Sequence, residues 1–139
     1  MAKRDEDIRK FRRAAEQRLS TARFLLEHEF FLEAIYLAGY SVECNLKHLI
    51  LKRTPSNQHR LMYANLTQAG AKGHDLEYLK NILRAAPVNC NAPRQISELL
   101  QRVSTWSTEL RYEVGKGRSK DAYRFLDAAQ EIAAWVERS

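Results

Sequence analysis

The chain has 139 residues, of which 45% are hydrophobic and 29% charged, and its formal net charge is +6. No apolar run approaches the ~18 residues that a membrane-spanning helix requires, and we expect no membrane partner. The length fits one domain covering residues 1–139. The charged N-terminal stretch, residues 1–7, has no apolar signal region, and we therefore expect a cytoplasmic location. The basic balance favours partners that carry phosphate.

The first two predicted helices form a long hairpin. Apolar residues recur at three- and four-residue spacing from about Asp5 to Glu29, and again from about Leu32 to Lys52; this spacing is typical of amphipathic helices. The short joint near Phe30-Phe31 implies that the two helices run antiparallel.

Four further segments show helical periodicity: 61–68, which is short, 76–85, 94–110 and 120–137. Asp75 stands where it can cap the N-terminus of one of these helices, and residues 70–73 read as a loop. No stretch alternates in the manner of a strand. The predicted fold is therefore all-α, an up-and-down bundle of four to five helices.

Polar residues interrupt the second predicted helix at helical spacing. Tyr36, Tyr40, Glu43 and Lys47 follow one another at steps of four, three and four, which places them on one side. Glu43 and Lys47 can pair one turn apart. Two interpretations stay open: a surface ion pair beside two half-buried tyrosines, or the polar lining of a cleft between subunits. Because Gly39 allows close helix packing and tyrosine is enriched at interfaces, we expect a symmetric homodimer.

Basic residues gather after the fourth main helix. Arg111 and Tyr112 end that helix, and Lys116 and Arg118 follow in a glycine-rich turn. These cations are either a phosphate-binding site or a solvated basic turn. The spacing of a phosphate-binding P-loop and its preceding strand are both absent.

Metal and cofactor chemistry find no support in the sequence. Cys44 and Cys90 lack the paired spacing of a zinc site, and a reducing compartment argues against a disulfide between them. His74 directly precedes a helix cap, where it either packs against the loop or acts as a base. No Ser/His/Asp arrangement is present, and we expect neither a metal nor a cofactor.

Four sequence elements, spread over most of the chain, carry a resemblance to a known family. They are Ala14-Ala15 followed by Ala22-Arg23-Phe24-Leu25-Leu26, Ala34 followed by Ala38-Gly39-Tyr40-Ser41-Val42-Glu43-Cys44-Asn45-Leu46-Lys47, Gly73-His74-Asp75-Leu76, and Leu110-Arg111-Tyr112. In this order they resemble the HEPN family of helical domains, which occur in prokaryotic toxin–antitoxin and defence systems.

The resemblance implies a bundle of four to five helices that commonly forms a homodimer. Active members of the family are metal-independent ribonucleases, in which an arginine and a histidine four to six residues later meet across the dimer interface. The arginine stabilises phosphate charge and the histidine assists proton transfer at the ribose 2′-hydroxyl. Other members are inactive partners of small nucleotidyltransferases.

The chain departs from the ribonuclease motif at its histidine. Arg111 matches the arginine, but Lys116, Gly117 and Arg118 stand where the histidine is expected. Two other pairs have a formally suitable spacing, Arg23…His28 within a helix and Arg53…His59 in a predicted loop. Residues five apart on a helix point away from each other, which argues against the first pair.

Three hypotheses follow. The first is a dimeric binding module whose basic cleft, with Arg111, Lys116 and Arg118, holds RNA or a nucleotide or docks a partner. The second is a metal-independent endoribonuclease that uses Arg111 with His74 or Glu43 as base. The third is a purely structural partner or an antitoxin-like subunit. The candidate protein partners are a nucleotidyltransferase-type protein and an antitoxin. The sequence favours binding over catalysis.

Overall fold

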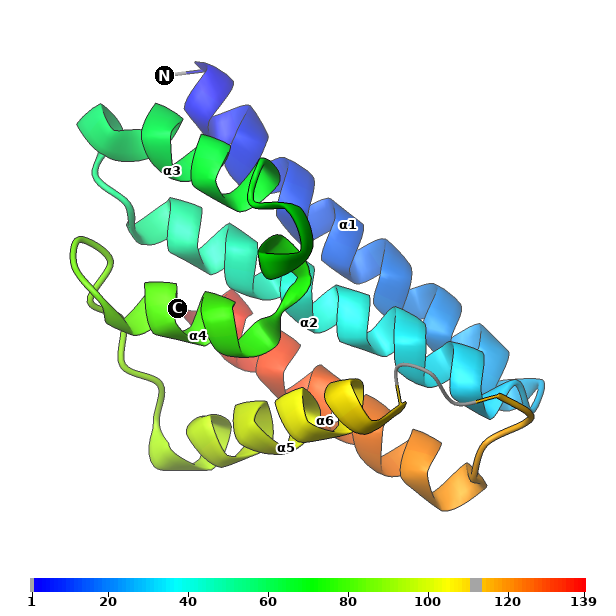
Figure 1. Cartoon of the computed structure of the whole chain (residues 1–139). Helices are drawn as coiled ribbons and strands as arrows, with labels where there is room; N and C mark the ends of the chain where they lie inside the picture. Colours follow the sequence, from blue (N-terminus) through cyan, green and yellow to red (C-terminus); the bar gives the residue numbers. More distant parts are fainter. Residues whose placement is uncertain (1, 111–113) are drawn as a thin grey trace.

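The computed structural model describes the backbone of residues 2–110 and 114–139 and the side chains of residues 2–105 and 114–139. Within these residues the chain forms α-helices and two 3-10 helices without any strand, which confirms the predicted all-α bundle (Figure 1). The elements are α1 (Ala2–Glu27), α2 (Phe31–Arg53), η1 (Ser56–Gln58), α3 (His59–Thr67), η2 (Gly70–His74), α4 (Leu76–Arg84), α5 (Arg94–Leu110) and α6 (Ser119–Arg138). The six described α-helices exceed the expected four to five because the two short segments form separate helices.

The long hairpin is present as predicted, with a slightly different joint. The chain turns at residues 28–30, where Glu29 has a φ of 65° and the Phe30 amide donates to the Leu25 carbonyl at 2.8 Å. Phe31 already belongs to α2 and is buried, so the joint lies just before the expected Phe30-Phe31 position. The antiparallel packing of α1 and α2 then forms the largest helix contact of the fold (Figure 1).

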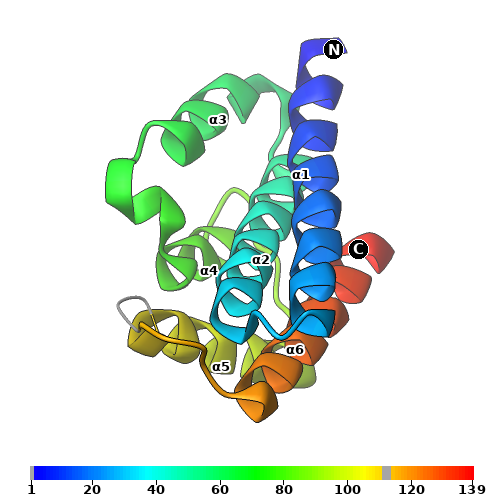
Figure 2. The same ribbon diagram turned by 90° about the vertical axis from the view of Figure 1, so that its right-hand side faces the viewer.

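Helix α2 is the central element of the bundle. Helices α1 and α6 pack against it, and α4 and α5 contact it as well; Figure 2 shows α2 between α1 and α4. All residues from 41 to 47 are buried, so the helix is covered on every side over this stretch. A helix surrounded in this way is normally apolar throughout, and its polar residues therefore require partners inside the protein.

The segment between α2 and α4 contains more helix than expected. Residues 70–73, predicted as a loop, belong to the 3-10 helix η2, and Gly70 has a φ of 64°. The predicted cap is confirmed, because the Glu77 amide donates to Asp75 Oδ1 at 2.9 Å. The chain thereby returns from the far end of α2 to its middle, where η2 and α4 begin the second side of the bundle.

The last helix closes the core. The apolar residues that recur at helical spacing in α6 are all buried: Ala122, Phe125, Ala129, Ile132 and Val136. None of the helices in the described part of the chain is long and apolar enough to cross a membrane.

Candidate functional site

Glu43 and Lys47 form an ion pair in the interior of the bundle. Lys47 Nζ lies 2.9 Å from Glu43 Oε2, and their side chains are only 7% and 8% exposed. The spacing of four residues predicted the pair, but the interpretation as a surface ion pair is wrong, because α2 is covered on every side here. The ammonium group also lies 5.9 Å from the centre of the Phe11 ring of α1.

His74 joins this pair from a distant part of the chain. Its Nδ1 lies 3.0 Å from the same Glu43 oxygen, Oε2, while 61% of the side chain stays exposed. Because the carboxylate can only accept, the Nδ1–H of His74 donates and Nε2 is the nitrogen not engaged with Glu43. Among the described residues, the structure thus brings together two of the predicted catalytic candidates, Glu43 and His74.

The contact depends on the close approach of η2 to the helices below it. A Cβ atom at Gly73 would lie 3.2 Å from the backbone oxygen of Leu66, closer than ordinary van der Waals contact. Glycine at this position lets η2 pack tightly against α3 and carry the next residue, His74, over Glu43.

Tyr40 extends the cluster to the surface. Its ring is 6.4 Å from the His74 ring, centre to centre, and the two planes meet at 78°. Tyr40 is 47% exposed, whereas Tyr36, one turn earlier, is partly buried. We call Tyr40, Glu43, Lys47 and His74 the α2–η2 cluster: two buried ions below and two aromatic rings at the surface.

The basic turn after α5 is fixed to the N-terminus of α2. The Leu32 amide donates to the Lys116 carbonyl at 3.2 Å, and a Cβ atom at Gly117 (φ +79°) would lie 3.2 Å from the Leu32 nitrogen. Lys116 Nζ lies 5.9 Å from the centre of the Phe31 ring, and Arg118 directly precedes α6. Both cations are exposed. The other predicted members of this region, Arg111 and Tyr112, lie outside the described residues.

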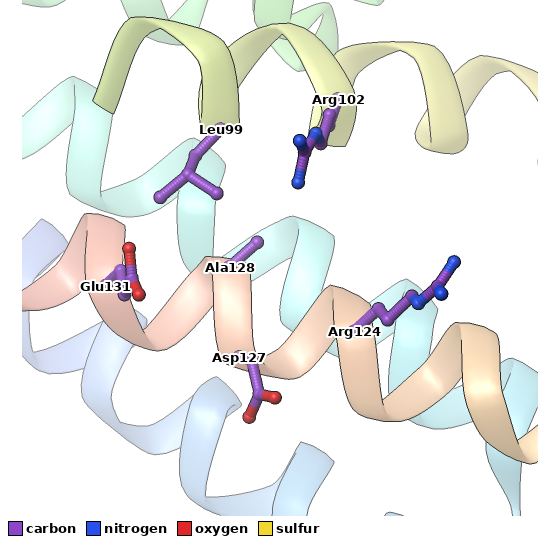
Figure 3. A pocket seen from close by; sticks show the side chains of 6 residues that line it. All are labelled: Leu99, Arg102, Arg124, Asp127, Ala128 and Glu131. Carbon is purple, nitrogen blue, oxygen red and sulfur yellow. The ribbon is translucent and has the colours of Figure 1, made fainter. Parts of the chain in front are cut away.

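A groove between α5 and α6 contains basic residues that the sequence analysis missed. It has a volume of about 520 Å³, with Leu99 and Ala128 as its apolar part (Figure 3). Arg102 of α5 and Arg124 of α6 lie toward one end and Glu131 lies at the other, with Asp127 between Arg124 and Glu131 along α6 (Figure 3). The four-residue spacing of Lys120 and Arg124 in the sequence could have predicted a basic face on α6.

A second carboxylate–histidine pair also escaped sequence analysis. His59 Nε2 lies 2.9 Å from Asp7 Oδ2, and both residues are buried. The predicted placement of Arg53…His59 in a loop is wrong, because Arg53 ends α2 and His59 begins α3. This histidine joins α3 to α1 and faces an acidic partner.

The two cysteines are buried and free. Burial raises the pKa of the Cys44 thiol, which keeps it protonated and unreactive at neutral pH;. Within the part of the chain that the structure describes, no group of three His, Cys, Asp or Glu side chains could hold a metal ion.

These features fit one family of helical domains. The sequence profile described as the HEPN domain matches residues 8–139, nearly the whole chain. The chain therefore belongs to the HEPN domain family. No match to the chain was found among curated proteins or among solved structures.

Proposed function

We propose that this HEPN domain is a binding module that holds RNA or a nucleotide by its phosphates, with the basic turn at the N-terminus of α2 as the main contact. The observation that carries the proposal is the hydrogen bond from the Leu32 amide to the Lys116 carbonyl. It fixes the backbone of the turn, so that Lys116 and Arg118 stay at one end of the bundle. The positive end of the α2 macrodipole adds to their attraction for phosphate.

The basic end of the α5–α6 groove supports the same proposal. Neither Arg102 nor Arg124 makes an ion pair with another residue of the described chain. Lys120 and Arg124 share a face of α6, and α6 starts directly after Arg118. The turn and this part of the groove together offer several guanidinium and ammonium groups to a phosphate backbone. Arg111 remains a predicted member of the site.

Salt dependence and a matched control test the proposal. Fluorescence anisotropy with a labelled single-stranded RNA should show tight binding at low salt that weakens as counterions compete. The double variant Lys116→Ala/Arg118→Ala should bind about tenfold more weakly, with a salt slope smaller by ~1.4 for two lost phosphate contacts. The control Lys52→Ala/Arg53→Ala removes the same charge from the opposite end of α2. Equal weakening by both double variants would contradict a site at the basic turn.

Arg111 requires a separate control. Arg111→Ala should also weaken RNA binding, and its thermal unfolding should be measured alongside. A loss of binding that accompanies a loss of folding would remove Arg111 from the proposed site.

We further propose that the module works as a symmetric homodimer, in a toxin–antitoxin or defence setting with a nucleotidyltransferase-type or antitoxin partner. The membership in the HEPN family supports this proposal. The protomer mass is 16.2 kDa. Light scattering at micromolar concentration should give twice that mass, and a particle of one protomer would contradict the dimer.

The α2–η2 cluster favours a second candidate function, metal-independent RNA cleavage. Glu43 fixes the tautomer of His74 and leaves its Nε2 for a ribose 2′-hydroxyl;. We still expect little or no cleavage. Lys116, Gly117 and Arg118 stand where active family members carry a histidine, and neither arginine nor lysine can act as a base because both stay protonated near neutral pH. The test is to incubate the purified protein with labelled RNA in the presence of a metal chelator and to measure RNA cleavage. Robust cleavage that His74→Ala abolishes, with the fold intact, would establish the second function.

A further inference from the structure

The surface of the α2–η2 cluster is an aromatic corner. The rings of Tyr40 and His74 meet nearly at a right angle, at 78°, with their centres 6.4 Å apart. Tyr40 is about half exposed and the His74 side chain more than half. At this angle the two exposed rings face different directions and together form one aromatic surface.

The corner is held in place from below. Glu43 Oε2 accepts from His74 Nδ1 at 3.0 Å and from Lys47 Nζ at 2.9 Å. The side chains of Glu43 and Lys47 are both buried. Tyr40 belongs to the central helix, and the tight packing at Gly73 fixes η2. A surface that is rigid before binding loses little conformational entropy when a planar ligand stacks on it.

The charge of the cluster suits an anionic ligand. The carboxylate of Glu43 is buried and neutralised by Lys47, so it presents little negative charge to the surface. Glu43 therefore adds little to the repulsion that a phosphate chain meets at the corner, where the exposed carboxylate next to His74 is that of Asp75, which accepts from the Glu77 amide;.

We propose that the Tyr40–His74 corner holds one nucleobase of a bound single-stranded RNA, with the base stacked on Tyr40 and the His74 ring closing one side. Every base has a π-face, so such a platform adds affinity without demanding a sequence. The proposal rests on the proposed function, which supplies the phosphate contacts. Tyr40 lies nine residues along α2 from Phe31, beside which Lys116 sits. This corresponds to ~13 Å along the helix axis and about half a turn around it, so the RNA has to pass around the helix between the phosphate contact and the base contact.

An abasic oligonucleotide separates the base contact from the phosphate contacts. Anisotropy titrations compare a short oligouridylate with an oligomer of the same length and charge whose riboses carry no base. The wild-type protein should bind the oligouridylate fivefold to a hundredfold more tightly. Tyr40→Ala should remove most of this preference and Tyr40→Phe should retain it. The control Tyr123→Ala, which removes a similarly exposed tyrosine of α6, should leave the preference unchanged.

The outcomes distinguish this inference from the proposed function. Equal affinity of the wild type for both oligomers, with salt-dependent binding of each, overturns the base site and leaves the phosphate site standing. Failure of both oligomers to bind overturns both proposals. A Tyr40→Ala variant that loses the preference and also changes its mass in light scattering assigns the corner to a subunit interface and overturns the base site.

Discussion

Two carboxylate–histidine pairs in this bundle have nearly the same chemistry and opposite surroundings. Asp7 binds His59 at 2.9 Å and Glu43 binds His74 at 3.0 Å, and both carboxylates are buried. The His59 side chain is 9% exposed, whereas that of His74 is 61% exposed. The first pair joins α1 to α3 inside the protein, and the second presents an imidazole to solvent. The comparison teaches that exposure of the histidine, and not the pair itself, makes a candidate site.

The lysines differ in the opposite sense. Lys3, 3.5 Å from Asp7, is 79% exposed, whereas Lys47, 2.9 Å from Glu43, is 7% exposed. The buried charge of Glu43 is therefore neutralised by Lys47, and His74 adds little to this neutralisation. The Asp7 pair depends more on its histidine, because the exposed lysine is screened by water.

The largest effect should come from breaking the buried ion pair. Glu43→Ala leaves the Lys47 ammonium buried without its carboxylate and should lower the free energy of unfolding by about 3–5 kcal/mol. The double variant Glu43→Leu/Lys47→Met, which removes both charges, should recover most of this loss. Urea denaturation followed by circular dichroism measures both. A loss below ~1 kcal/mol for Glu43→Ala would show that water reaches Lys47.

The inner histidine should matter next. His59→Phe keeps a ring of similar size but leaves the Asp7 carboxylate without its buried donor, which should cost about 1–3 kcal/mol of unfolding free energy. The Nδ1 atom of His59 is buried without a hydrogen-bond partner in the described structure, and its removal offsets part of the loss. The same denaturation assay applies, and an unchanged midpoint would contradict the importance of this link.

The exposed histidine should matter least for folding. His74→Ala should change the unfolding free energy by less than about 0.5 kcal/mol, because the side chain is mostly solvated and Lys47 still neutralises Glu43;. The ratio of the His59→Phe loss to the His74→Ala loss measures how far the two pairs differ. If His74→Ala lowered the unfolding free energy as much as His59→Phe does, the contact of η2 with Glu43 would be important for folding.

A third histidine sharpens the comparison, because it is partly buried with a neutral acceptor. His48 Nδ1 lies 2.8 Å from the Ile8 carbonyl, and burial lowers the pKa of the imidazole. The unfolded chain then binds the proton more readily, so the unfolding free energy should fall as pH drops below ~6.5 toward the lowered pKa. His48→Gln should flatten this part of the pH profile. His28→Gln, which removes an exposed histidine, is the control for the loss of a histidine elsewhere on the surface.

Local patterns were enough to predict the helices and one contact of the site. The four-residue step from Glu43 to Lys47 predicted their pair, and Asp75 predicted its own cap. The burial of the pair follows from α2 being surrounded by other helices, which no local pattern contains. His74 is 31 residues from Glu43, so only the tertiary path of η2 brings them together. Asp7 and His59 were missed for the same reason.

The contact of Gly117 with Leu32 limits how the basic turn can be studied by scanning mutagenesis. Any side chain at this position would combine a strained left-handed backbone with a tight contact, 3.2 Å from the Leu32 nitrogen in the first turn of α2. Such a variant would shift the turn and move Lys116 and Arg118 together. A scan would then assign to a glycine, which has no side chain, the full loss of its two basic neighbours. The contribution of this turn to binding is therefore best measured with substitutions of Lys116 and Arg118 alone, in a protein that retains Gly117.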